Sequence, residues 1–331
     1  MPAPAASAPA ILSTRSGTPA QPRRGGLPTQ RSWLLKNATV YPVDAQSTVI
    51  ANGAVAIEDG IITAVGKTSE VRPPPNSQTL DARGHMIVPG FINPHWHEVS
   101  ALRLQPPADE EIDDRDVKTT VFSLGGDYVG LVNMFQDFFD LNFVLTPEEA
   151  YALSFYGLMN QLRTGTTFVG DMGSINHWDS MARAMLSLGM RGGPSIWSLD
   201  TRLDAASGRP ASTRPAEKVI AANEAMLSRW AREPTGLVRA QPSMLLPLAS
   251  SDALIEGLGE LAARYDVPFV MHAAAARNEN ATSERFFGAN SIQRLERAGV
   301  LSPRLTLAHA AFISDAEREL LIAKGVNITH T

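Results

Sequence analysis

A regular alternation of short apolar runs with stretches of helical periodicity occupies most of this 331-residue chain and constrains its fold more than any other feature. Runs rich in β-branched residues that alternate with helices are typical of βαβ units, so an α/β fold with a parallel sheet is predicted. Helices are predicted from Thr146 to Leu162 and near 215–231, 251–264, 288–298 and 314–324. Seven strands are predicted, in MIVPGFINPHWH, TTFVGD, GGPSIWSL, GLVRAQPS, VPFVMH, LTLAHA and VNITH.

Two segments precede this alternation. Residues 1–31 are rich in Ala, Pro and Ser and contain four arginines and no acidic residue. Such a composition buries too little apolar surface to fold, so a disordered tail is predicted. Residues 32–88 hold β-branched runs separated by turn residues, and Asp59-Gly60 between two apolar runs is a strong hairpin signal. This second segment is expected to form a small antiparallel β module.

Composition excludes several classes of function. The chain has no cysteine, so it has no disulfide and no thiolate ligand, and any metal must be held by His, Asp or Glu. The formal charge of −5 argues against broad binding to nucleic acid or to an anionic membrane, and no apolar run reaches the roughly 20 residues of a membrane helix. We therefore expect a cytoplasmic protein with a small-molecule substrate, no nucleic-acid partner and no membrane partner; a homo-oligomer is a further expectation.

Five of the seven histidines lie at the ends of predicted strands: His95 and His97, His272, His309 and His330. In a parallel α/β barrel these ends lie on one face, where active sites are built. Residues i and i+2 of a strand point the same way, so His95 and His97 can hold one ion together. A single histidine at a strand end is more often structural, and for His330 both interpretations stay open. His95, His97 and His272 together predict a metal site.

The motif PGFINPHWH resembles the amidohydrolase-superfamily signature, in which a Pro-Gly-Phe-Ile run precedes two histidines one residue apart. VMHAAA and LTLAHAAFIS are similar to the histidine segments of that family's fifth and sixth strands. GVNITHT resembles the seventh-strand segment of the branch that holds triazine hydrolases, guanine deaminases and S-adenosylhomocysteine deaminases. The resemblance covers residues 32–331. It implies a TIM-like (β/α) barrel in residues 89–331, with residues 32–88 as half of a β-sandwich.

The resemblance also implies a metal-dependent hydrolase that acts on C–N bonds other than peptide bonds. Deamination, dechlorination or amide hydrolysis of a small, aromatic heterocyclic substrate is expected, by a metal-bound hydroxide. One divalent metal, Zn or Fe, is expected on His95, His97 and His272. His309 is expected to assist catalysis by holding the water or the substrate.

The chain departs from the family pattern at two places. Ala275 stands where that branch has a glutamate that moves protons. Glu279 is predicted to replace it, with Glu98 as an alternative, although a surface carboxylate is the commoner interpretation of both. The chain also stops after the seventh strand, so the barrel is expected to lack its eighth strand and the aspartate on it. A catalytically impaired relative that binds only a metal or a partner is therefore the alternative function, and unpaired strand edges are expected to favour association.

Substrate contacts are less specified. Residues 98–145, between the first strand and its helix, are a candidate lid. The candidate contacts are the polar and aromatic side chains at the first, second, third and seventh strand ends: Trp96, Asp171, His177, Trp197 and His330.

Overall fold

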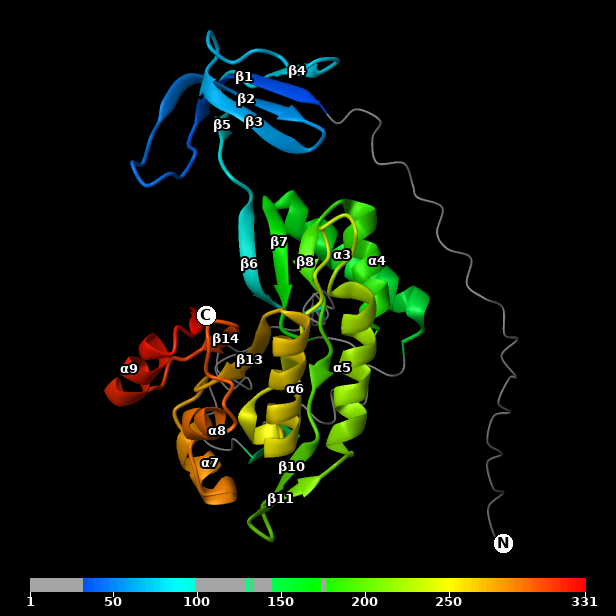
Figure 1. Cartoon of the computed structure of the whole chain (residues 1–331), viewed down its shortest axis with the longest axis vertical. Helices are drawn as coiled ribbons and strands as arrows, with labels where there is room; N and C mark the ends of the chain where they lie inside the picture. The colour runs from blue at the N-terminus through cyan, green and yellow to red at the C-terminus, as the bar shows by residue number, and fades with distance from the viewer. Residues whose placement is uncertain (1–31, 99–128, 131, 134–144, 174–176) are drawn as a thin grey trace, which may run out of the picture. The chain divides into compact units, whose positions relative to one another are not determined.

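The computed structural model describes residues 32–98, 129–130, 132–133, 145–173 and 177–331. The predicted tail and most of the candidate lid lie outside these residues. The chain divides into two compact units, Met1–Ile87 and Val88–Thr331. Figure 1 shows the strands of the first unit and the alternating strands and helices of the second.

The first unit is a sheet of five strands: β1 (Trp33–Val40), β2 (Ile50–Glu58), β3 (Ile61–Lys67), β4 (Gln78–Asp81) and β5 (Met86–Ile87). The predicted hairpin is confirmed, because Glu58 pairs with Ile61 across a two-residue turn. Asp59 and Gly60 both have positive φ there, at 49° and 83°, which suits a right-twisted hairpin. The expectation of a purely antiparallel module is wrong, since β4 and β5 both pair with β1 in parallel.

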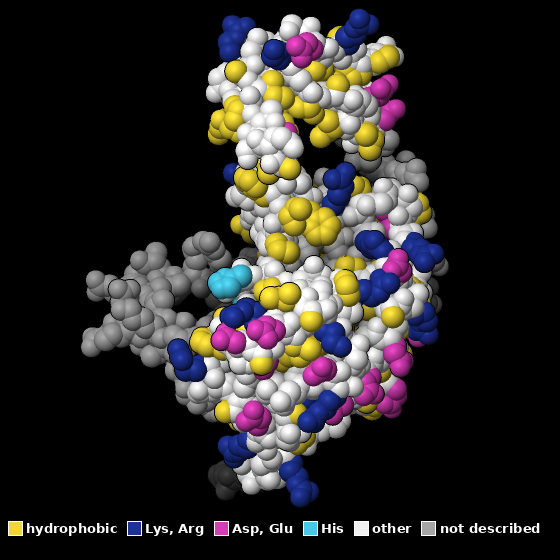
Figure 2. Space-filling model, turned by 60° about the vertical axis from the view of Figure 1, so that its left-hand side comes forward, with side chains coloured by type: hydrophobic (Ala, Val, Ile, Leu, Met, Phe, Trp, Pro, Cys, Tyr) yellow, Lys and Arg dark blue, Asp and Glu magenta, His cyan; other side chains and the backbone are white. Residues whose placement is uncertain are grey.

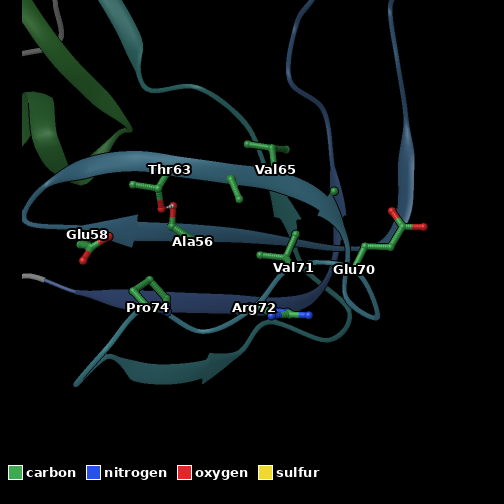
Figure 3. A pocket seen from close by; sticks show the side chains of 10 residues that line it. Ala56, Glu58, Thr63, Val65, Glu70, Val71, Arg72 and Pro74 are labelled. Carbon is green, nitrogen blue, oxygen red and sulfur yellow. Dashed lines mark hydrogen bonds between the residues drawn. The ribbon is translucent and has the colours of Figure 1, made fainter.

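A groove of about 450 Å³ lies on this first sheet (Figure 3). It is lined by the facing parts of β2 and β3 and by the segment that follows β3. The Thr63 hydroxyl donates to the Ala56 carbonyl at 3.4 Å across the two strands, and Glu58, Glu70 and Arg72 lie at the rim. The groove belongs to the β-sheet unit and not to the unit that carries His95, His97, His272 and His309.

The second unit holds a run of parallel strands in sequence order, as predicted. β6 (Phe91–Trp96), β7 (Thr166–Asp171) and β8 (Arg191–Gly193) pair in that order. The others pair as β9 (Trp197–Ser198), β12 (Ser243–Met244), β13 (Phe269–Ala273), β14 (Leu305–His309) and β15 (Asn327–Thr329). A parallel bridge between Gly192 and Val238 joins the two sets. β8 and β9 together thus form the predicted third strand, and residues 238–244 form the fourth.

The helices that follow the strands are α3 (Pro147–Arg163), α4 (Trp178–Leu188), α5 (Ala216–Trp230), α6 (Asp252–Tyr265), α7 (Glu279–Phe287), α8 (Ser291–Arg297) and α9 (Asp315–Ala323). Hydroxyl and amide side chains fix several helix starts; Thr146, Asn290 and Ser314 each form a capping box. The sequence did not predict α4, α7 or the hairpin of β10 (Thr201–Asp204) and β11 (Arg209–Ser212). α7 and the hairpin have few apolar positions, whereas α4 has a clear amphipathic pattern, with Met181 and Met185 buried four residues apart, that the sequence prediction missed.

The main apolar core lies between the parallel strands and the helices, with Val169, Leu258 and Leu307 among its buried members. Among the described strands, β6 pairs only with β7, and β15 only with β14. Ile92 and Ile328 on these two strands are exposed. On the face shown in Figure 2, hydrophobic side chains reach the surface between interspersed acidic and basic ones. No described helix has the length and apolar character to span a membrane.

A buried arginine braces the loop that follows the fourth strand. The Arg294 guanidinium of α8 is 3% exposed and donates to the carbonyls of Pro247 at 2.6 Å and Ser250 at 2.7 Å. It also pairs with Asp252 at 2.7 Å and lies over the ring of Phe287. Pro247 belongs to a short 3₁₀ helix, η2 (Pro247–Ala249), two residues after Leu245.

Replacing Arg294 by Met should therefore destabilise the second unit strongly. Two buried carbonyls would lose their donors, and each loss costs about 1–3 kcal/mol. We expect the free energy of unfolding, measured with urea, to fall by roughly 2–5 kcal/mol. Arg304→Met is the matched control, because Arg304 forms an exposed ion pair with Asp266. Such pairs contribute about 0–1 kcal/mol. Equal losses in the two variants would contradict the bracing role of Arg294.

Candidate metal centre

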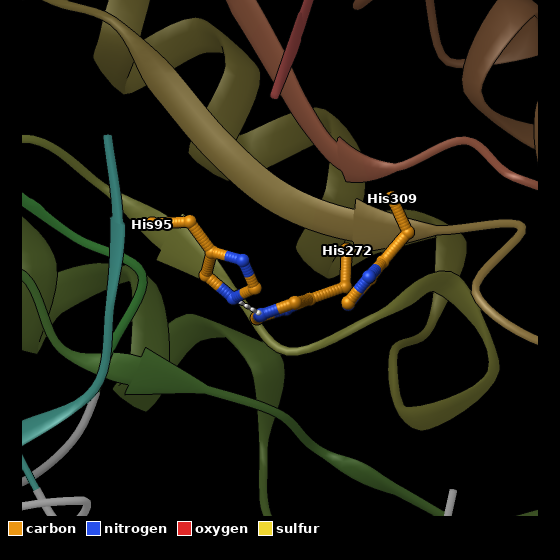
Figure 4. Close-up of side chains that lie close together, drawn as sticks. All are labelled: His95, His272 and His309. Atoms are coloured by element: carbon orange, nitrogen blue, oxygen red, sulfur yellow. Dashed lines mark hydrogen bonds between the residues drawn. The ribbon is translucent and has the colours of Figure 1, made fainter. Parts of the chain in front are cut away.

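Three histidine nitrogens converge where β6 and β13 end. The Nε2 atom of His95 lies 3.1 Å from that of His97 and 3.1 Å from that of His272, and the last two lie 3.0 Å apart. His95 and His97 share a side of the chain because one residue separates them, and β13 delivers His272 to the same point. Figure 4 shows His95, His272 and His309 turned toward one another.

Backbone carbonyls fix which nitrogen carries the proton in two of these rings. His97 Nδ1 donates to the Gly173 carbonyl at 2.7 Å, and His272 Nδ1 donates to the Leu245 carbonyl at 2.6 Å. A neutral imidazole has one N–H, so the Nε2 atoms of both rings are unprotonated. Their lone pairs face each other at 3.0 Å with no hydrogen between them. A proton on His95 Nε2 would not relieve this contact, whereas a cation at the centre would.

The arrangement fits a zinc-sized ion. Zn–N bonds are about 2.0–2.1 Å, and tetrahedral angles at that length place ligand nitrogens roughly 3.4 Å apart. The observed separations of 3.0–3.1 Å are a few tenths of an ångström shorter. Hydrogen bonds from the other ring nitrogen to carbonyls are also what metal-ligating histidines use to fix their orientation.

Burial keeps these histidines neutral. It lowers the pKa of His95 to about 3, with further lowering by His97 and His309. Burial also lowers the pKa of His97 to about 4, although the hydrogen bond to Gly173 opposes it. The pKa of His272 lies well below the usual value, and that of His309 is lowered too, both mainly through burial. Neutral imidazole is the form that binds a metal.

His309 lies beside the three converging nitrogens. Its ring centroid is 5.2 Å from that of His95 and 5.5 Å from that of His272, and it has a candidate ligand atom within 4.8 Å of theirs. His309 Nδ1 is 2.7 Å from the Thr331 hydroxyl oxygen. The backbone of His309 is in the left-handed region, with φ of 75°. Residues other than glycine seldom adopt this conformation. The turn at the end of β14 therefore sets the direction of this ring.

Glu279 is buried and hydrogen-bonded, which corrects its interpretation as a surface carboxylate. Its two carboxylate oxygens accept from the backbone N–H groups of Ala274 and Ala275 and from the Ser291 hydroxyl, each at 2.8 Å. Ala274 has φ of 50°, and Glu279 thus stabilises a strained turn directly after β13. This carboxylate holds the segment that follows His272, and its predicted role in proton transfer stays a prediction.

Glu98 and Asp171 are two buried carboxylic side chains near the end of β6, and both are 0% exposed. The prediction of a surface position for Glu98 is wrong. Burial, and then the charge of Asp171, raise the pKa of Glu98 well above its usual value. Asp171 Oδ2 accepts from the backbone N–H and the hydroxyl of Ser195, at 3.1 and 2.9 Å. Asp171 thus ties the end of β7 to the chain between β8 and β9, which argues against the substrate contact predicted for it.

The other predicted substrate contacts lie in different surroundings. Trp96 packs in the main core, because it alternates with His95 and His97 and so faces the opposite way. His177 precedes α4, and its Nε2 donates to the Leu145 carbonyl at 2.9 Å. His330 is exposed after β15. Burial in the core argues against the predicted contact of Trp96, and the contacts of His177 and His330 stay predictions. Trp197 stacks on His97 at 5.6 Å between ring centroids.

Because the folded state keeps His97 neutral, the metal-free protein should lose stability in mild acid. An unfolded histidine takes up its proton near pH 6.5, whereas His97 does so at about pH 4. Between these values the unfolded chain binds more protons, so the free energy of unfolding falls as the pH falls. From pH 6.5 to 5, wild type should lose roughly 1.5 kcal/mol more than His97→Gln, as measured by urea unfolding in a chelator. His330→Gln controls for loss of a histidine; identical pH profiles of wild type and His97→Gln would contradict the prediction.

Comparison with known proteins identifies a family. Residues 86–331 match the amidohydrolase family. The chain is 27% identical over 301 residues to a 5-methylthioadenosine/S-adenosylhomocysteine deaminase of Nitratidesulfovibrio vulgaris, a match that covers 90% of this chain and 61% of that protein. The chain thus spans less than two thirds of the length of the curated relatives it matches.

Solved structures share the fold. Atrazine chlorohydrolase from Arthrobacter aurescens, complexed with zinc, has a TM-score of 0.72 and 22% identity, covering 90% of this chain and 65% of that one. An adenosine deaminase from Xanthomonas campestris with bound zinc has a TM-score of 0.71 and 24% identity, covering 91% and 62%. Both of those structures contain zinc. The histidine cluster of this chain could hold a metal ion. The family match covers more than half of the residues, and the chain belongs to the amidohydrolase family.

Proposed function

We propose that this protein is a metal-dependent hydrolase that cleaves C–N bonds other than peptide bonds in small heterocyclic substrates, with deamination as the favoured reaction. The single observation that carries the proposal is the contact of three histidine Nε2 atoms at 3.0–3.1 Å, two of them held unprotonated by carbonyls. His95, His97 and His272 are the proposed ligands of one Zn or Fe ion. When bound, such an ion supplies a Lewis acid that lowers the pKa of coordinated water toward about 7.

The residues of the chain prepare this site before any substrate arrives. The Gly173 and Leu245 carbonyls hold His97 and His272 in the tautomer that leaves Nε2 free for an ion. Burial keeps the rings neutral at neutral pH, so protons compete weakly for the same nitrogens. The side chains therefore need little reorganisation to bind the ion.

His309 is the proposed proton-handling residue. It lies against His95 and His272, and its Nδ1 is engaged with the Thr331 hydroxyl, which leaves Nε2 for a substrate or a water. Ala275 cannot transfer a proton, and Glu279 has three donors on its carboxylate. A positioned acid or base typically raises a rate by 10²–10⁴-fold. The proposal therefore requires His309 to raise the rate by a factor of that order.

The substrate class rests on the named relatives, several of which are deaminases of adenosine derivatives. We propose a planar amino-substituted heterocycle, with chloro-substituted triazines as the second class because of the structural likeness to a chlorohydrolase. A catalytically impaired protein that only binds metal or a partner is the second candidate function. The observation that favours it is the fully hydrogen-bonded Glu279 next to Ala275, the position at which a proton-transferring glutamate was expected.

The test is ammonia release from adenosine, 5-methylthioadenosine and guanine, and chloride release from a chlorotriazine, by Zn- and Fe-loaded protein. We expect turnover of at least one amino-substituted compound, with loss of metal and activity in His97→Ala. His309→Asn should keep the metal and lower kcat by about 10²-fold or more. His177→Gln is the matched control and should retain both. Metal binding without turnover of any compound would favour the second candidate function.

The role of Glu279 is separable from that of His309. Because Glu279 stabilises the turn after β13, Glu279→Gln should lower the free energy of unfolding by roughly 1–3 kcal/mol, as expected when a buried hydrogen bond to a charged group is weakened. The pH dependence of kcat should keep its shape in this variant. A rate loss of about 10²-fold or more with unchanged stability would instead identify Glu279 as the base.

A further inference from the structure

Trp197, His97 and His272 contact one another in that order at the candidate metal centre. The Trp197 indole lies on His97 with 5.6 Å between ring centroids and an interplanar angle of 28°. The His97 and His272 rings are nearly parallel, at 17°, and meet edge to edge through their Nε2 atoms, with 4.9 Å between ring centroids. His97 therefore contacts the indole through its face and His272 through its Nε2 edge. A rotation of His97 about its side-chain bonds would break contact with the indole.

The indole is packed in a buried apolar cluster. Trp197 is 3% exposed and belongs to a buried apolar cluster with Leu199, Leu203 and Leu245. Leu245 also supplies the carbonyl that fixes His272. The ring stack and the hydrogen bond of His272 thus depend on one packed group of side chains, formed where β9 and β12 end.

Gly173 is the second residue that holds the His97 ring in place. A Cβ atom added there would lie 2.6 Å from the Ser243 hydroxyl and 2.8 Å from the Trp197 Cα, and Gly173 has φ of 89°. Only glycine lets this backbone pass so close to Trp197 and still present its carbonyl to His97 Nδ1 at 2.7 Å. The indole holds the plane of the ring, and the carbonyl holds its rotation within that plane.

We propose that Trp197 is a positioning residue, which fixes the His97 ring by stacking so that its Nε2 points at the metal, and that it is not a substrate contact as the sequence led us to expect. This rests on the proposed metal site. A side chain with 3% of its surface exposed offers little area to a substrate, whereas the indole is stacked against His97. Residues that orient metal ligands typically contribute 10–100-fold to metal affinity.

The test compares Trp197→Leu, which removes the ring, with Trp197→Phe, which keeps an aromatic face. Zn²⁺ affinity is measured by competition with a chromophoric chelator, and ligand geometry by the visible spectrum of the Co²⁺-loaded protein. We expect the Leu variant to bind Zn²⁺ about 10–100-fold more weakly with an altered Co²⁺ spectrum. The Phe variant should stay within about 3-fold of wild type. Trp197→Met replaces the Leu variant if the latter does not fold.

Trp230→Leu is the matched control. Trp230 is also buried but lies on α5 in the main core, and its indole N–H donates to Asp179 at 3.2 Å. This variant should lose stability and keep its Zn²⁺ affinity, which separates positioning from general destabilisation. Equal Zn²⁺ affinities and Co²⁺ spectra in wild type and Trp197→Leu would overturn the proposal, as would equal losses in the Trp197 and Trp230 variants.

A metal-independent readout separates this proposal from the proposed function. In metal-free protein labelled at its seven histidines, NMR reports the ring protons of His97. Removal of the indole should move these signals downfield, because the ring current is lost, and should broaden the signal of the proton on Nδ1. If the wild-type protein does not bind Zn²⁺, the proposed metal site is wrong. If the His97 signals are the same in wild type and Trp197→Leu, the positioning role of Trp197 is wrong.

Discussion

The close approach of unprotonated nitrogens at the end of β6 and β13 is the constraint on which the site depends. Two Nε2 lone pairs lie 3.0 Å apart because carbonyls of Gly173 and Leu245 take the only proton of each ring. Such an arrangement is unfavourable without a cation and favourable with one. The fold holds it in place by packing, since β13 is buried throughout and Trp96, between His95 and His97, lies in the main core.

The surroundings of the histidines act mainly by holding backbone in unusual conformations. Ala274 and His309 both have positive φ, directly at the ends of β13 and β14. Glu279 hydrogen-bonds the first turn, and Arg294 braces the loop after Leu245 from the other side. Glu279 and Arg294, which have the chemistry of catalytic groups, thus fix loops here. His309 remains as the polar ring beside the three converging histidines.

Much of this followed from sequence patterns. Alternating runs predicted the parallel strands, and the two-residue spacing of His95 and His97 predicted their shared direction, because side chains of a strand alternate with period two. Strand ends at one edge predicted the meeting with His272 and His309. The same alternation, applied to Trp96, would have placed it in the core and removed it from the candidate substrate contacts.

What the sequence determined by itself was the order of the parallel strands, the Asp59-Gly60 hairpin and the set of histidines available to a metal, because these depend on local periodicity and residue chemistry. Tertiary structure alone decided the burial and the contact partners of Glu98, Glu279 and Trp197. Their burial and partners come from segments distant in the chain, such as Ser291 for Glu279 and His97 for Trp197. A glutamate or tryptophan has the same local pattern whether it faces solvent, braces a turn or stacks on a ligand, and only packing distinguishes these.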